Sequence, residues 1–434
     1  MHQLLHLLVV DHEGRAALAD MHGTKWLLPM VSCSERTRAV SSIQRWIDQR
    51  RLTGALIGQW VGRLTIDAAA IDWLVVFRAS AQVSRSSNQA LCWIPLDRLR
   101  SSASVFDYQQ WAVGMVSAGG SPRVAGPFGA FTWTEGVHAW LGAVVDGSPD
   151  DSRSVVYRAG AHEVVTCVPT ATGPMYFKGL AHDRAVEAHV TSALAAAMPG
   201  SFARTRAAAP QDDGSLWWLA ESCAGVPLAQ RLTLENAECV AAACARTQSE
   251  ALSLARLDAH LPRLDLRGAA AWGIELLRSA AHHSEGDSCS EAIAYACDEV
   301  DRAAAPCSWV PMDLDPANVL VDSHGAVRFI DLDDSYRGPS ALAMATFARR
   351  VRRLDVERKV SVEALYRAYE RSSSWSALGD RAWRAFEIMS DVLEARLGWE
   401  RVVRNASRGE LHGPLTPVAE RLALRLVRGV NGQL

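Results

Sequence analysis

The stretch Val310-Pro-Met-Asp-Leu-Asp-Pro-Ala-Asn-Val-Leu-Val-Asp322, continued by Val327-Arg-Phe-Ile-Asp-Leu-Asp-Asp334, decides how this chain is interpreted. The apolar run 319–321 predicts a short buried strand, and residues 327–330 predict the strand that returns beside it. Between them, Ser323-His-Gly325 predicts a turn in which the glycine supplies a positive φ. The stretch is therefore expected to form a β-hairpin.

Three polar side chains are expected at one rim of this hairpin. Asp313 and Asn318 lie on the loop before the first strand, which Pro316 stiffens, and Asp331 ends the second strand. Two oxygen ligands and a neighbouring carboxylate base are what magnesium-assisted phosphoryl transfer requires. The alternative is an ordinary hairpin with surface acids, because Asp-Pro and His-Gly turns are common.

The whole stretch resembles the catalytic and metal loops of the aminoglycoside phosphotransferase-like (choline kinase-like) branch of the protein-kinase fold. That family typically has H-G-D-x-x-P-x-N followed by I-D. The resemblance implies that Asp313 is the catalytic base and that Asn318 and Asp331 bind magnesium. Pro311 and Met312 stand where the family usually has His and Gly, which alters the hydrogen bonding that supports the loop.

A lysine upstream fits the same resemblance. Met175-Tyr-Phe-Lys-Gly-Leu180 predicts a strand that carries Lys178, one of only three lysines in the chain. The resemblance implies that Lys178 contacts the α- and β-phosphates of ATP and that Glu187, in the first turn of the next helix, pairs with it. The alternative is a surface ion pair, which contributes at most about 1 kcal/mol.

The segment after this lysine resembles the hinge between the two lobes of a kinase. Residues 216–222 predict an apolar strand that ends in the polar crossover Glu221-Ser222, where backbone groups would meet adenine. Gly225-Val-Pro-Leu228 resembles the family's segment after the hinge. A buried strand followed by a loop is the alternative, and it is compatible with the hinge.

Residues 1–134 resemble a Nudix hydrolase domain in the order of their strands and in the segment Trp93-Ile-Pro-Leu-Asp-Arg-Leu99. Nudix chemistry needs a cage of glutamates on the helix expected between Glu35 and Arg51, but Asp48 is the only acid within 41–50. One carboxylate does not hold the required metal. We therefore expect a degenerate Nudix-like domain for binding or architecture, with an unrelated α+β domain as the alternative.

Two helical features outside these motifs bear on the fold. Residues 134–145 predict a helix that docks on the domain after it, because Val137 and Leu141 share one face. Residues 223–434 are expected to be mostly helical, and their run Arg349-Arg350 with Arg352-Arg353 is typical of a solvated helix face. A site for a substrate phosphate is the alternative for this run.

Composition limits the class of protein. A hydrophobic content of 49% and a charged content of 21% are typical of a soluble globular chain. A net charge of −3 gives no electrostatic basis for binding nucleic acid or an anionic membrane. The nine cysteines form no C-x-x-C pair, and residues 1–6 have no basic region before an apolar core. These features predict a cytoplasmic protein, and the preference for arginine over lysine suggests a bacterial source.

We therefore predict an α+β chain in three parts: a Nudix-like α/β/α sandwich domain (1–134), then the small β-rich lobe (135–222) and the helical lobe (223–434) of a protein-kinase-like fold. The expected activity is ATP- and Mg²⁺-dependent transfer of the γ-phosphoryl group to a hydroxyl of a small molecule, such as an amino sugar, a sugar or a nucleoside. Two alternatives stay open: a Ser/Thr kinase for a precursor peptide, and a non-catalytic pseudokinase. No motif specifies the acceptor or the oligomeric state.

Overall fold

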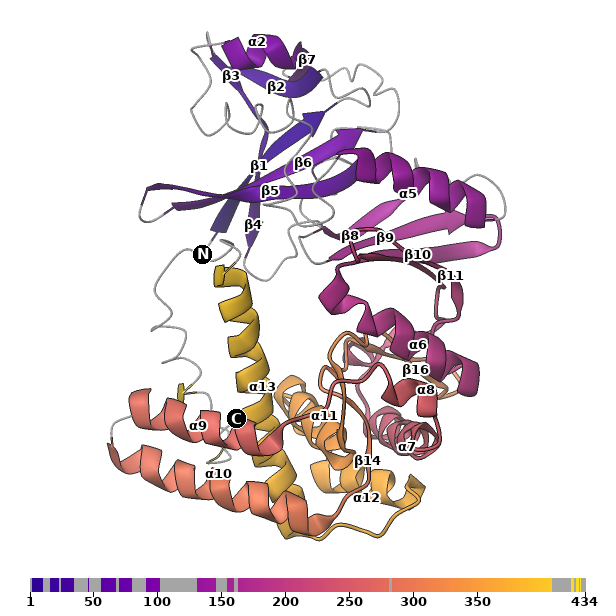
Figure 1. Ribbon diagram of the computed structural model, residues 1–434, viewed down its shortest axis with the longest axis vertical. Coiled ribbons are helices and arrows are strands. Elements are labelled where there is room, and N and C mark those ends of the chain that lie inside the picture. The colour runs from indigo at the N-terminus through magenta and orange to yellow at the C-terminus, as the bar shows by residue number, and fades with distance from the viewer. Residues whose placement is uncertain are drawn as a thin grey trace. The chain divides into compact units, whose positions relative to one another are not determined.

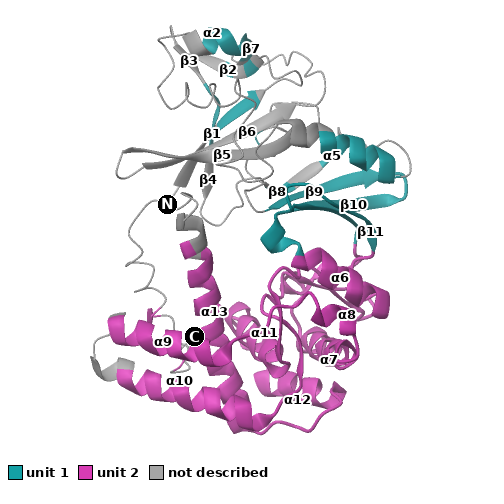
Figure 2. Ribbon diagram, in the orientation of Figure 1, with its two compact units in different colours: residues 1–185, 205–222 teal, residues 186–204, 223–434 magenta. Residues whose placement is uncertain are grey.

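The computed structural model describes residues 2–10, 16–22, 25–34, 46, 56–67, 70–79, 91–101, 131–145, 154–159, 163–280, 283–407, 423, 424, 427, 428 and 430. The chain folds into two compact units (Figure 2), one of residues 1–185 with 205–222 and one of residues 186–204 with 223–434. The predicted boundary after residue 222 coincides with a boundary between these units. The division into three domains stays a prediction.

The first unit contains a mixed sheet of seven described strands, in which β1 pairs in parallel with β6 (Figure 1). Its strands are β1 (His2–Val10), β2 (Ala16–His22), β3 (Lys25–Leu27), β4 (Met30–Ser34), β5 (Leu56–Asp67), β6 (Ala70–Ala79) and β7 (Leu91–Pro95), and α2 (Leu96–Ser101) follows β7. The helix predicted between Glu35 and Arg51, with Asp48, lies outside the described residues except for Trp46, which is helical and buried.

A second sheet in the same unit is antiparallel, with the order β11-β12-β10-β9-β8. Its strands are β8 (Val155–Ala159), β9 (Glu163–Thr170), β10 (Gly173–Leu180), β11 (Thr205–Pro210) and β12 (Leu216–Glu221). Helix α5 (Phe131–Val144) packs against it, with Val137 and Leu141 in one apolar cluster with Phe177, Trp217 and Leu219 (Figure 1). The predicted docking of this helix is therefore confirmed.

The second unit is mainly helical, as predicted. Its helices are α6 (Val186–Ala197), α7 (Leu234–Ala251), α8 (Ala255–Asp258), α9 (Leu266–Ala280), α10 (His283–Ala303), α11 (Ala341–Leu354), α12 (Val362–Ser372) and α13 (Asp380–Ser407). Helix α11 is buried along most of its length, and Phe347 on α11 and Phe386 on α13 are fully buried. Within the described part of the chain, no helix has the length and apolar character needed to cross a membrane.

Two small sheets connect these helices to the loop quoted first. One has the order β13-β15-β16, formed by β13 (Val226–Pro227), β15 (Val319–Val321) and β16 (Val327–Phe329). The predicted hairpin is thus present, and Gly325 in its turn has a φ of +78°. Gly225 precedes β13 with a φ of +126°, and a Cβ there would lie 3.1 Å from the Cβ of Leu320, so this position requires glycine.

The other small sheet pairs β14 (Cys307–Pro311) with β17 (Ser335–Pro339), and the sequence did not predict it. A fully buried glutamine ties this sheet to α7 and α12. The Nε2 of Gln248 donates to the carbonyl oxygens of Trp309 (2.8 Å) and Ser340 (2.9 Å), and its Oε1 accepts from the Tyr369 hydroxyl (2.6 Å). These bonds satisfy polar groups in the core and set the position of β14.

Candidate active site

The β14–β17 pair sets the geometry of the site. Pro311 lies opposite Ser335 in the antiparallel register, and the Met312 amide donates to the Asp334 carbonyl oxygen at 2.8 Å. Because β14 ends where the Asp313 loop begins and β17 begins directly after Asp334, the residues that flank the two strands meet at one end of the pair. The acids before β17 are therefore placed beside Asp313.

The loop from Asp313 to Asn318 is held by its own hydrogen bonds. The Asn318 Nδ2 donates to Oδ2 of Asp313 at 3.0 Å, and the Asn318 backbone amide donates to the Asp315 carbonyl oxygen at 2.8 Å. The Ile330 amide donates to the Asn318 carbonyl oxygen at 3.0 Å, which joins the loop to the residue before Asp331. Asp313 and Asn318 are thus in direct contact, and both are half-buried.

Asp331 has an unusual backbone conformation. Its φ is +60°, whereas side chains other than glycine rarely adopt positive values. Such a conformation costs on the order of 1–3 kcal/mol and is found most often at functional sites. The roles of Asn318 and Asp331 as magnesium ligands stay predictions.

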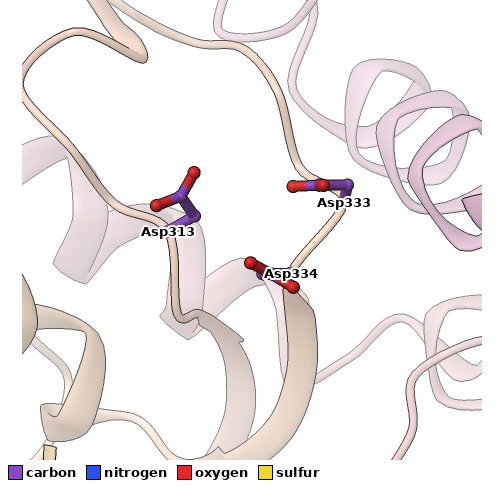
Figure 3. A group of neighbouring side chains, drawn as sticks. All are labelled: Asp313, Asp333 and Asp334. Atoms are coloured by element: carbon purple, nitrogen blue, oxygen red, sulfur yellow. The ribbon is translucent and has the colours of Figure 1, made fainter. Parts of the chain in front are cut away.

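The described acids that gather at Asp313 are Asp333 and Asp334 (Figure 3). One carboxylate oxygen of each of these three residues lies within 4.8 Å of the others, and all three side chains are half-buried. Carboxylate oxygens at this spacing suit a hard cation such as Mg²⁺. The cluster includes Asp313, the implied base, but not Asp331, the implied magnesium ligand. Neither Asp333 nor Asp334 was assigned a role from the sequence, although two consecutive acids after a predicted strand were a signal for them.

Arg350 of α11 contacts the loop directly. Its Nη1 donates to Oδ1 of Asp313 at 2.5 Å, and its Nη2 donates to the Met312 carbonyl oxygen at 3.3 Å and to Oε1 of Glu394 at 2.9 Å. Burial by itself lowers the pKa of the Arg350 guanidinium, but the charges of Asp313 and Glu394 outweigh this effect and raise that pKa above its ordinary value. Arg350 therefore stays protonated beside the acid cluster.

The interpretation of the arginine run as a solvated helix face is wrong for its first two members. Arg349 and Arg350 have side chains that are only 4% and 12% exposed. Arg349 forms ion pairs with Asp391 and, at 2.7 Å, with Glu394, both on α13. The physical reason is that α13 presents carboxylates to the buried side of α11, so these arginines bind acids of the protein itself.

A further arginine, which lies on α13, pairs with the acid cluster. Arg401 forms an ion pair with the Asp334 carboxylate. Together with Arg350 at Asp313, it gives two of the three clustered carboxylates a cationic partner from a helix. These pairs offset the mutual repulsion of acids placed this close together.

The structure places the predicted nucleotide-binding residues on separate elements. Lys178 is half-buried on β10, opposite Trp218 of β12, and its Nζ lies 6.0 Å from the centre of the Trp218 ring. Glu187 is 1% exposed in the first turn of α6. Lys178 belongs to the first unit and Glu187 to the second, so their pairing stays a prediction.

The predicted hinge lies where the chain passes from the first unit to the second. Glu221 is the last residue of β12, and the Ser222 amide donates to the Pro174 carbonyl oxygen at 3.2 Å. The first unit ends at Ser222 and the second resumes at Cys223. Contact of Glu221 and Ser222 with adenine stays a prediction.

Neither a sequence family nor a curated protein matches the chain. Among solved structures, it is similar to an aminoglycoside phosphotransferase from Ralstonia eutropha, with 14% identity, a TM-score of 0.48, and 69% of this chain and 98% of that chain covered. It is also similar to a choline kinase from Streptococcus pneumoniae, with 11% identity, a TM-score of 0.48 and coverages of 68% and 99%. A third is the kanamycin and GDP complex of an APH(2") enzyme, with 11% identity, a TM-score of 0.49 and coverages of 68% and 98%. Because these TM-scores lie below 0.5, function has to be inferred from the residues themselves.

Proposed function

We propose that this chain is an ATP- and Mg²⁺-dependent phosphotransferase that moves the γ-phosphoryl group to a hydroxyl of a small molecule. The observation that carries the proposal is the arrangement at Asp313. This carboxylate accepts a hydrogen bond from Asn318 at 3.0 Å and lies in one cluster with Asp333 and Asp334. Phosphoryl transfer needs a positioned base beside oxygen ligands for magnesium, and we assign both to this loop and the chain that pairs with it.

The roles proposed for the side chains follow from their chemistry. Asp313 orients the acceptor hydroxyl and takes its proton, while Asn318 and Asp331 hold magnesium, with Asp333 as an additional acid. Bound magnesium would offset the negative charge of the phosphate oxygens. The acid cluster itself is consistent with such a cation, because its three carboxylate oxygens lie within 4.8 Å of one another.

Roles in nucleotide binding are proposed for Lys178, Glu187 and the segment Glu221-Ser222. Lys178 would contact the α- and β-phosphates and would itself be held by Glu187, while backbone groups at Glu221 and Ser222 would meet the adenine. What supports this role is the position of Lys178, which is half-buried on the central strand of its sheet. Lys178 is on the face of β10 opposite to Phe177, which packs under α5.

One observation favours a second candidate, a non-catalytic nucleotide-binding protein. Arg350 donates to Oδ1 of Asp313 at 2.5 Å, so the proposed base already has a cationic partner. Pro311 and Met312 also replace the usual His and Gly. The carboxylate nevertheless keeps lone pairs for a substrate proton, since an ionised Asp has about four acceptor sites.

For residues 1–134 we propose a binding or architectural role in a degenerate Nudix-like domain. Its described strands β1 to β7 form one mixed sheet. The segment 41–50, which would have to supply the glutamates of a metal cage, offers only Asp48. A catalytic Nudix activity is therefore not part of the proposal.

The test of the proposed function is a measurement of ADP release from Mg-ATP with a panel of hydroxyl compounds. The panel includes kanamycin, spectinomycin, choline, ethanolamine, free sugars, nucleosides and a Ser/Thr peptide mixture. We expect ADP release that one acceptor class stimulates and that EDTA abolishes. Absence of ADP release with every acceptor, combined with stabilisation by Mg-ATP, would support the non-catalytic candidate instead.

Lys178→Ala is expected to weaken binding of Mg-ATP while leaving the fold intact, because its side chain is only half-buried. The wild type should be stabilised by about 2.7 kcal/mol at a nucleotide concentration of about 100 times its Kd. The variant should lose most of this stabilisation in a thermal-shift titration. The control is Lys359→Ala, which removes an exposed lysine that forms an ion pair with Glu357. Equal stabilisation of the Lys178 variant and the wild type would contradict the assignment.

A further inference from the structure

We propose that Arg350 is the positioning residue for Asp313 and that it provides the support that Pro311 and Met312 do not. This inference rests on the proposed function, because it concerns the base of that reaction. In the sequence, Arg350 is part of a basic run, and no local pattern links it to the Asp313 loop. The contacts of its guanidinium group carry the inference.

The Arg350 guanidinium contacts three acceptors on two separate segments. Nη1 donates to Oδ1 of Asp313 at 2.5 Å, and Nη2 donates to the Met312 carbonyl oxygen at 3.3 Å and to Oε1 of Glu394 at 2.9 Å. The loop, α11 and α13 are thereby joined at one planar group. A planar guanidinium orients its partners more strictly than a single ammonium group does.

The effect on Asp313 is specific, because both of its carboxylate oxygens receive a donor. Oδ1 accepts from Arg350, and Oδ2 accepts from Nδ2 of Asn318 at 3.0 Å. Rotation of the carboxylate would break one or both hydrogen bonds. The plane of the group is therefore set by the two donors together, and Asn318 alone would leave Oδ1 without this restraint.

The environment of Arg350 makes this restraint strong. Its side chain is 12% exposed and that of Asp313 is 35% exposed, so the ion pair is partly buried and is screened by salt less than a surface pair is. Arg350 also pairs with Glu394, which binds Arg349 as well, and its Nη1 lies 3.5 Å from Oδ2 of Asp315. Arg350 thus lies between acids of the loop and an acid of α13, and it does not depend on Asp313 alone for its position.

The first experiment compares Arg350→Ala, Arg350→Lys and Arg352→Ala in the full-length protein. Arg352 is the matched control, because it lies on the same helix, is 39% exposed and pairs with Glu387 away from the loop. With the acceptor found in the ADP-release panel, Arg350→Ala should lower kcat by about 10–100-fold, the effect of a small misplacement of a reacting group. The KM for ATP should change less than about twofold, since only a transition-state interaction is lost. Arg350→Lys should recover part of the loss, and Arg352→Ala should match the wild type.

A double variant separates positioning from general damage. In the Asp313→Asn background, Arg350→Ala should cost little further turnover, because an arginine that acts through Asp313 has no base left to position. If instead the two losses multiply, Arg350 acts independently of Asp313 and the inference is wrong. An unchanged kcat in Arg350→Ala would also overturn it.

A second measurement does not depend on catalysis. Hydrogen exchange of the backbone amides at 312–318 should be faster in Arg350→Ala than in the wild type, while the amides of α12 keep their protection. Unchanged exchange at 312–318 would overturn the inference even in an inactive protein. If the wild type releases no ADP with any acceptor but this local effect is present, the proposed function fails and the positioning role of Arg350 stands.

Discussion

Asp313→Asn is expected to lower turnover by about 10²–10⁴-fold, the usual contribution of a general base. Asparagine has nearly the same shape as aspartate, but its amide does not accept the proton of the acceptor hydroxyl. The affinity for ATP should change little, because Asp313 is proposed to face the acceptor. The measurements are kcat on the acceptor that the wild type uses and the thermal shift with Mg-ATP.

Asp331→Asn is the informative comparison for this variant. It removes a proposed magnesium ligand, so its loss of turnover should be accompanied by a higher magnesium requirement. Asp313→Asn should keep the magnesium requirement of the wild type more closely. Wild-type turnover of Asp313→Asn would show that another group accepts the proton, and Asp333 would then be the first alternative, because it lies in the same carboxylate cluster.

Arg349→Met is expected to destabilise the second unit by about 3–5 kcal/mol, the usual cost of removing one partner of a buried ion pair. The Arg349 side chain is 4% exposed, and its partner Asp391 is 5% exposed. Removal of the arginine leaves the Asp391 carboxylate in the interior, where only Arg353, at 3.8 Å, remains as a cationic partner among the described ion pairs. Urea unfolding curves of the variant and the wild type measure the change.

The control for this prediction is Arg352→Met, three residues further along α11. Its side chain is 39% exposed, and exposed ion pairs contribute at most about 1 kcal/mol. The free energy of unfolding of this variant should therefore stay within about 1 kcal/mol of the wild type. Equal stability of Arg349→Met and Arg352→Met would mean that the buried pair contributes no more than a surface pair.

Local sequence patterns determined the elements whose partners are near in the chain. The hairpin of β15 and β16 follows from two apolar runs joined by a turn, and its Gly325 has the positive φ that the turn predicts. The helices of the second unit follow from apolar residues at helical spacing. The contact of Asp313 with Asn318 was also predictable, because the two residues lie five positions apart on a proline-stiffened loop.

The tertiary structure decided what depends on contacts distant in sequence. Strand β14 meets β17, which places Asp333 and Asp334 beside Asp313. Arg350 reaches Asp313 from 37 residues away, and Arg401 reaches Asp334 from 67 residues away. Such contacts follow from the packing of α11 and α13 against the loop, and no local periodicity encodes which acid a given arginine meets. A run of arginines looks the same in the sequence whether its helix face is solvated or buried against carboxylates, because only the neighbouring helix determines its burial.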